Sequence, residues 1–109
     1  MEKGPSAFGE YWTSEYEEVK HFNTHGKQMG YEKLSDYSKA ACEFANRKDE
    51  NSISFIANEQ KNYSLYKYDK ETNVFIIISR TGKIVTYYPP RGGFEYFYRQ
   101  FEKWGDHWN

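Results

Sequence analysis

Two histidines, His21 and His25, stand four residues apart in a segment whose apolar residues recur at helical spacing. Side chains with this spacing share one face of a helix, and Gly26 follows directly, where a helix often ends. Histidine titrates near neutral pH, so such a pair can supply a general acid and a general base. The same pair can instead form half of a metal site, or serve the fold alone by bonding a backbone carbonyl or the helix end.

A metal site would need further ligands, because zinc is normally held by three or four protein side chains. The metalloprotease motif places a glutamate directly after its first histidine, and here that position is Phe22. Cys42 is the single cysteine, and the third histidine, His107, lies close to the end of the chain. Phosphate-binding and dinucleotide-binding glycine motifs are absent as well. We therefore predict no metal and no cofactor.

Metal-free cleavage of RNA remains open to this set of residues. That reaction needs a base for the ribose 2′-hydroxyl, an acid for the leaving 5′-oxygen, and hydrogen-bond donors around the transition state. Strand alternation would place Ile84, Thr86 and Tyr88 on one face. Ordinary structural roles are open too, Thr86 as a strand former and Tyr96 on a solvated helix face. The candidates of suitable type are His21, His25, Lys83, Thr86, Tyr88 and Tyr96.

Periodicity predicts the helices that would carry some of these side chains. A first helix is expected over residues 10–25, a second one capped by Ser35, and a last one over Phe94–Trp104. The predicted inward residues are Trp12, Tyr16, Val19 and Phe22 in the first, Leu34, Tyr37, Ala41, Phe44 and Ala45 in the second, and Phe94, Phe97, Tyr98, Phe101 and Trp104 in the last.

Between the second and last helices the apolar period changes to two. Strands are predicted over Ser52–Ala57, Tyr63–Tyr68, Val74–Ile78 and Lys83–Tyr88, with Val74–Ile78 central because it is apolar on both faces. Two helices, an antiparallel meander of three or four strands and a C-terminal helix make an α+β fold. The length of 109 residues predicts a single domain over residues 1–109.

The composition adds a second functional hypothesis. Aromatic residues make up 20% of the chain, although its mean hydropathy is only −1.02. Aromatic side chains must then supply much of the core, and exposed ones would also suit a non-catalytic protein-binding module. The net charge of −1 does not favour a general nucleic-acid binder, although basic residues outnumber acidic ones over residues 72–109. No apolar run is long enough to insert into a membrane.

The order and spacing of several short motifs resemble a known family. The first motif is His21-Phe22-x-x-His25-Gly26-Lys27-x-Met29-Gly30-Tyr31. The later ones are Tyr37 with Ala40-Ala41 and Phe44, Thr72-Asn73-x-Phe75, Gly82-Lys83-Ile84-x-Thr86-Tyr87-Tyr88-Pro89, and Tyr96-Phe97-x-x-Gln100. Together they resemble the cytotoxic C-terminal domains of bacterial LXG-type polymorphic toxins, which are similar to ribonuclease domains of some contact-dependent inhibition toxins.

The resemblance implies a secreted ribonuclease used in interbacterial competition, with a fold similar to the barnase–EndoU–colicin–RelE group. Such a toxin acts on RNA in the cytoplasm of the target cell, and a cognate immunity protein neutralises it as a heterodimer. The chain would then be the toxin module of a larger modular protein, and Met1 would not be its natural start. By position, the catalytic candidates are His21, His25, Thr86 and Tyr96. Tyr88 and Gln100 also match by position and are substrate-binding candidates, and Lys83 and Arg91 join them as cationic side chains suited to a phosphate.

Overall fold

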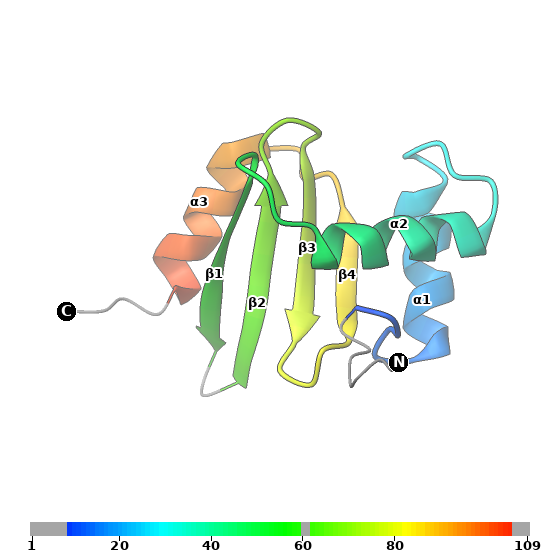
Figure 1. The fold of residues 1–109 in the computed structure, drawn as a ribbon, viewed down its shortest axis with the longest axis horizontal. Coiled ribbons are helices and arrows are strands. Elements are labelled where there is room, and N and C mark those ends of the chain that lie inside the picture. The colour runs from blue at the N-terminus through cyan, green and yellow to red at the C-terminus, as the bar shows by residue number, and fades with distance from the viewer. Residues whose placement is uncertain (1–8, 60–61, 106–109) are drawn as a thin grey trace.

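The computed structural model describes residues 9–59 and 62–105, and it confirms the α+β fold. Four antiparallel strands follow one another along the chain and lie in the same order in the sheet, so the sheet is a simple meander (Figure 1). Short connections suffice between such neighbours. The strands are β1 (Ser52–Glu59), β2 (Asn62–Asp69), β3 (Val74–Ser79) and β4 (Ile84–Tyr88).

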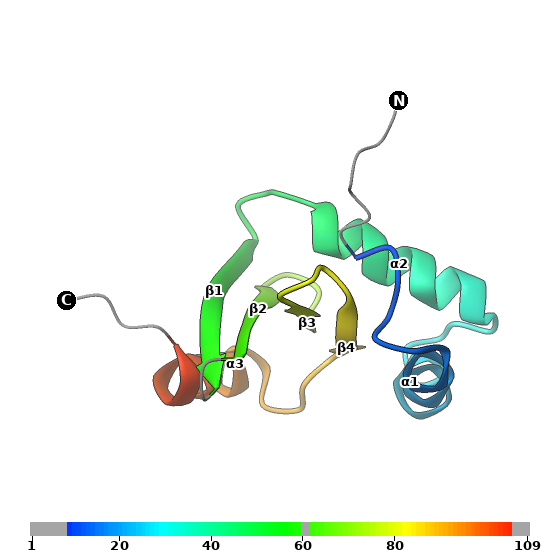
Figure 2. The same ribbon diagram turned by 90° about the horizontal axis from the view of Figure 1, so that it is seen from below.

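Helices lie on both faces of the sheet and beyond one of its edges. Helix α2 (Leu34–Asn46) covers one face, and α3 (Gly93–Trp104) lies against the other face near β1 (Figure 2). The N-terminal helix α1 (Glu15–His21) continues into a short π-helix, η1 (Phe22–Gly26), and both contact β4. The predicted order of elements is therefore confirmed.

Each face of the sheet has its own aromatic core. The core under α2 contains Tyr37, whose side chain is fully buried and whose hydroxyl donates to the backbone carbonyl of Tyr87 at 2.5 Å. The smaller core under α3 is built around Phe75 and Phe97. The predicted stripe of α2 is confirmed, since Tyr37, Ala41, Phe44 and Ala45 are all buried.

The first helix is shorter than predicted. The side chain of Ser14 accepts a hydrogen bond from the backbone N–H of Glu17 and so caps α1 at its start. Trp12 therefore lies outside the helix, where it forms a parallel bridge with Ile84 of β4. Tyr16 and Val19 are 72% and 44% exposed, so their predicted burial is wrong. The half-buried residues of α1 are instead the polar Glu17, Glu18 and His21, so the helix has no continuous apolar stripe.

Two other predictions about helices are wrong. Lys33, not Ser35, precedes the first residue of α2, and no side chain caps that end. In α3, Phe94 and Tyr98 are 51% and 47% exposed, although periodicity placed them inward. Their rings stack on each other, and the Phe94 ring also approaches Tyr68 of β2.

A register shift changes the faces of β4. Ile77 pairs with Thr86 whereas the adjacent Ile78 pairs with Ile84, so Val85 is the extra residue of a β-bulge. Ile84 consequently points into the core under α2. Tyr88 packs in the core on the opposite side. The prediction that Ile84 shares a face with Thr86 and Tyr88 is therefore wrong.

Candidate active site

His21 and His25 lie at a place where the helix changes its geometry. His21 is the last residue of α1, and the π-helical turn after it includes His25 and is closed by a hydrogen bond from the Lys27 N–H to the Phe22 carbonyl at 3.1 Å. Single π-helical turns are frequent at functional sites. The two imidazole rings stack with centroids 5.6 Å apart and an interplanar angle of 26°. The predicted pairing of the histidines on one side of the helix thus exists.

Gly26 allows this turn to lie close to α2. A β-carbon at this position would come within 2.6 Å of the Phe22 ring and 2.9 Å of the Tyr37 ring. Any side chain here would push the turn away from α2. The glycine after His25 thus sets how deeply the histidine segment is seated.

His21 contacts residues of α1 and β4. Its Nδ1 lies 3.2 Å from the Thr86 hydroxyl oxygen, and its Nε2 lies 3.4 Å from a carboxylate oxygen of Glu17. The Trp12 ring packs beside it at a centroid distance of 5.5 Å. Burial lowers the pKa of His21, the Glu17 carboxylate opposes that effect, and the charge of Lys20 adds to it.

His25 lies between His21 and Tyr88. Its ring stacks on the Tyr88 ring with centroids 4.8 Å apart and an angle of 22°. Burial lowers the pKa of His25, and the neighbouring His21 lowers it further. An imidazole with a lowered pKa is neutral, and able to accept a proton, over more of the range near pH 7.

Tyr88 extends the contacts to α3. Its hydroxyl lies 2.7 Å from the hydroxyl of Tyr96, so one of the two donates to the other. Burial and this hydrogen bond raise the pKa of Tyr88 well above its ordinary value. Tyr88 therefore remains protonated near neutral pH, and the hydroxyl that accepts within the pair can still donate to another acceptor. We call the continuous set Thr86, His21, His25, Tyr88 and Tyr96 the histidine–tyrosine row.

The row brings together all four catalytic candidates and one substrate-binding candidate. The other three, Lys83, Arg91 and Gln100, are not part of it within the described residues. Lys83 is exposed in the turn before β4, Arg91 is exposed in the loop after β4, and Gln100 is half-buried one turn beyond Tyr96 on α3. Arg91 and Gln100 follow the Tyr88 end of the row along the chain, whereas Lys83 precedes its Thr86 end.

Sequence reasoning missed Glu17 and misplaced Trp12. Glu17 precedes His21 by four residues, a spacing that brings a carboxylate and an imidazole together on a helix, so the signal was present. Trp12 reaches His21 only because its segment pairs with β4, and no local pattern indicates that. Its indole N–H is buried without a hydrogen-bond partner among the described residues.

The sequence Glu17–His21–Thr86 also has the order of carboxylate, imidazole and hydroxyl found in nucleophilic hydrolases. A nucleophile must reach the substrate, however, and Thr86 is only 7% exposed. The arrangement therefore suits support of His21 better than attack by the threonine. Proton transfer by imidazole is the chemistry that this geometry favours.

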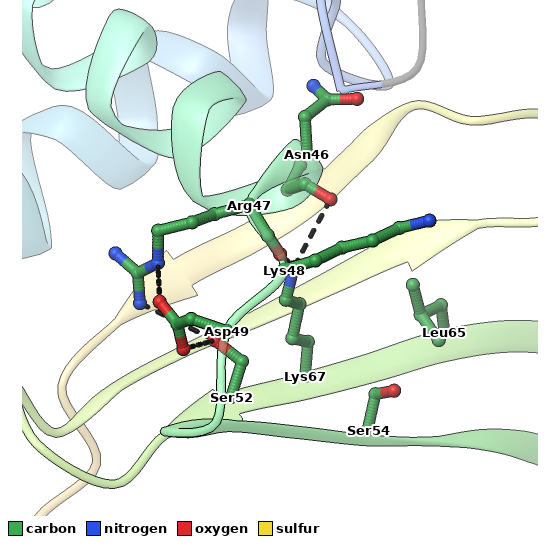
Figure 3. A pocket seen from close by; sticks show the side chains of 9 residues that line it. Asn46, Arg47, Lys48, Asp49, Ser52, Ser54, Leu65 and Lys67 are labelled. Atoms are coloured by element: carbon green, nitrogen blue, oxygen red, sulfur yellow. Dashed lines mark hydrogen bonds and ion pairs between the residues drawn. The ribbon is translucent and has the colours of Figure 1, made fainter.

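A separate pocket of about 570 Å³ lies between the end of α2 and strands β1 and β2 (Figure 3). Two of the cations that line it, Lys67 and Arg47, already have partners within the protein. The Lys67 ammonium donates to the carbonyls of Phe44, Ala45 and Arg47 at the end of α2, and Arg47 forms ion pairs with Asp49 and Asp69. None of the predicted site residues lines this pocket. The Lys67 charge in it stabilises the carbonyls at the end of α2.

The described part of the chain contains neither a cluster of metal-binding side chains nor a helix that could span a membrane. Within residues 9–59 and 62–105, no three His, Cys, Asp or Glu side chains gather where they could hold a metal ion. The third histidine, His107, lies outside the described residues. No described helix is long and apolar enough to cross a bilayer.

No protein-family model matches this chain, and comparison with curated proteins gives no match. The class of the molecule is therefore defined by its own structure. It is an α+β domain in which a stacked histidine pair from the N-terminal helical segment lies against the last strand of an antiparallel sheet.

Proposed function

We propose that this domain is a cytotoxic, metal-independent ribonuclease. The observation that carries the proposal is the histidine–tyrosine row. It joins two imidazoles of lowered pKa to two hydrogen-bonded tyrosine hydroxyls, drawn from two segments distant in sequence, α1–η1 and β4–α3. Imidazoles suit both proton transfers of RNA cleavage near neutral pH, and neutral hydroxyls suit donation to a phosphate.

In the proposed reaction a base of the row removes the proton from a ribose 2′-hydroxyl. The 2′-oxygen attacks the adjacent phosphorus, the bond from phosphorus to the 5′-oxygen breaks, and an acid of the row protonates that leaving oxygen. The products are a 2′,3′-cyclic phosphate and a free 5′-hydroxyl. The Tyr88 ring stacks on His25 and its hydroxyl is hydrogen-bonded to that of Tyr96, and we expect this pair of hydroxyls to supply the donor that stabilises charge on the phosphate.

The test is cleavage of a single-stranded RNA by the purified domain, compared with His25→Ala. Parent protein should cleave RNA to cyclic-phosphate ends, and it should leave an otherwise identical strand intact when the reacting ribose lacks its 2′-hydroxyl. The variant should keep the circular dichroism spectrum of the parent and lose cleavage. Full cleavage by a folded His25→Ala protein would remove His25 from the mechanism.

The proposal extends to delivery and control. We propose that the domain is secreted by a producing cell, acts on RNA in the cytoplasm of a rival cell, and is held inactive in the producer by an immunity protein. Tight protein–protein complexes of this kind bury on the order of 1,600 Å² in total. The product of the adjacent downstream gene should rescue growth on co-expression and co-elute with the domain as a 1:1 complex.

The second candidate function is a protein-binding module without catalysis. The exposed and stacked pair Phe94 and Tyr98 on α3 favours it, because exposed aromatic rings are enriched at protein interfaces. Expression separates the two classes. A binding module should be produced freely in bacteria with all site residues intact, whereas a ribonuclease should arrest growth unless its immunity protein is present.

A further inference from the structure

Both ring nitrogens of His21 have partners inside the protein. Nε2 faces the Glu17 carboxylate one helical turn earlier, at 3.4 Å, and Nδ1 faces the Thr86 hydroxyl on β4, at 3.2 Å. The Trp12 and His25 rings also contact the His21 ring, at centroid distances of 5.5 Å and 5.6 Å. His21 is therefore fixed in position, orientation and hydrogen bonding.

The partners also fix which nitrogen carries the proton. An ionised carboxylate only accepts hydrogen bonds, so the Nε2 facing Glu17 must carry hydrogen. In the neutral imidazole the other nitrogen, Nδ1, then accepts the hydrogen bond, and the Thr86 hydroxyl donates it. When His21 is protonated, Nδ1 donates instead and the Thr86 oxygen accepts. Both charge states are satisfied by the same two neighbours.

His25 differs in this respect. Its ring is held by stacking between His21 and Tyr88, but neither of its nitrogens has a hydrogen-bond partner among residues 9–59 and 62–105. Stacking fixes the plane of a ring and leaves its edge free to exchange a proton. The charged and titratable groups around the pair are Glu17 and Lys20 on α1 and Tyr88 and Tyr96 on β4 and α3.

We propose that Glu17 is a positioning residue, which with Thr86 holds His21 in a single tautomer, and that His25 is the imidazole that exchanges protons with RNA. It takes the proton of the 2′-hydroxyl and returns it to the leaving 5′-oxygen. This inference rests on the proposed ribonuclease function and divides the labour between its two histidines. His21 acts through His25, by supporting its ring and by placing a titratable charge beside it. Glu17 contributes by keeping the tautomer and orientation of His21 constant.

The positioning role can be measured without any substrate. Nitrogen-15 shifts of the imidazoles report which nitrogen is protonated and at which pH each ring titrates. We expect the Nε2–H tautomer for His21 in the parent protein. In Glu17→Ala both tautomers should be populated, and the pKa of His21 should fall because the carboxylate that raises it is gone.

Glu15→Ala is the matched control, since Glu15 is an exposed acid in the same first turn of α1. It should leave both histidines unchanged. An unchanged tautomer and titration of His21 in Glu17→Ala would overturn the positioning role. If Glu17→Ala and Glu15→Ala changed the titration of His21 equally, the change would come from the overall charge of α1. That outcome would also overturn the positioning role of Glu17.

Activity tests the division of labour. His25→Ala should lower kcat/KM for RNA by 10²-fold or more, the ordinary contribution of a general acid or base, whereas His21→Ala and Glu17→Ala should cost only about tenfold. The pKa of His25 in the pH profile should rise in His21→Ala, because a neighbouring positive charge is lost. Equal losses in the two histidine variants would overturn the assignment. If the parent protein does not cleave RNA, the proposed function and the role of His25 fail together, while the imidazole shifts still decide the role of Glu17.

Discussion

Replacing Thr86 by valine separates two roles that the hydroxyl can have. Valine is nearly isosteric and favours strands, so the change removes the oxygen and leaves the packing of β4 in place. The side chain is 7% exposed and its hydroxyl is 3.2 Å from His21 Nδ1. The substitution thus deletes one hydrogen bond and creates no cavity.

The size of the effect follows from that bond. A neutral hydrogen bond contributes about 0.5–1.5 kcal/mol, and about 1.36 kcal/mol corresponds to a tenfold change in rate. If Thr86 serves to orient His21, as its contact indicates, kcat/KM should fall by roughly 2- to 12-fold. The free energy of unfolding should fall by no more than about 1.5 kcal/mol, because the half-buried His21 can recruit water in place of the hydroxyl.

The assay is single-turnover cleavage of a short RNA by the parent, Thr86→Val and the control Thr13→Val, with stability measured by urea unfolding. Thr13 is exposed, and its backbone N–H, not its side chain, bonds to Ile84. A loss of roughly 10²–10³-fold would show that the hydroxyl donates directly to the reacting phosphate, as an oxyanion donor does. That result would refute the orienting role. An unchanged rate would reduce Thr86 to a strand former.

Three further predictions concern metal, pH and the end of α2. Cleavage should persist in EDTA, and its loss in chelator with recovery in zinc or magnesium would contradict acid–base catalysis by the row. The pKa values of His21 and His25 are lowered in the fold, so the folded state binds fewer protons than the unfolded state below the ordinary histidine pKa of about 6.5. Stability should therefore fall as the pH drops below that value, and a double His→Gln variant should flatten the slope measured by urea titration. Finally, Lys67→Met should lower the free energy of unfolding by about 2–3 kcal/mol, because it leaves carbonyls at the end of α2 without their charged donor. Lys48→Met, at an exposed cation beside the same pocket, should change stability little, and equal effects would show that the hydrogen bonds of Lys67 contribute nothing.

The fold could be predicted because its elements carry local signals. The apolar stripe of α2 is a regular helical repeat, and the strands alternate or are apolar on both faces between clear turns. Prediction failed where a long-range contact decides the outcome. Tyr16 and Val19 fit a helical stripe, but α1 lies beyond the edge strand β4, and both side chains are exposed there.

The candidate site was predicted in its residue types and not in its geometry. Spacing alone paired His21 with His25, and chemistry selected Thr86 and Tyr96. The bulge at Val85 decides which face of β4 each residue occupies, and a single extra residue leaves no mark in an alternating pattern. The stacking of Tyr88 on His25 depends on how two distant segments dock, which no sequence window contains.

The histidine–tyrosine row joins the histidines of α1 and η1 to residues of β4 and α3, which lie far along the chain. This separation determines when in folding the row can form. Each strand of the meander pairs with its immediate successor, so the sheet can form from short loops at little entropic cost. His21 and Thr86 are 65 residues apart, and the segment before α1 reaches β4 through backbone bonds from Ile84 to Tyr11 and from Thr13 to Ile84. Contacts of this range close a long loop and so cost more entropy than the pairings within the sheet. A nascent chain thus carries both histidines well before the site exists, and it stays chemically incomplete until β4 and the start of α3 have emerged and the segment before α1 has closed onto the sheet edge.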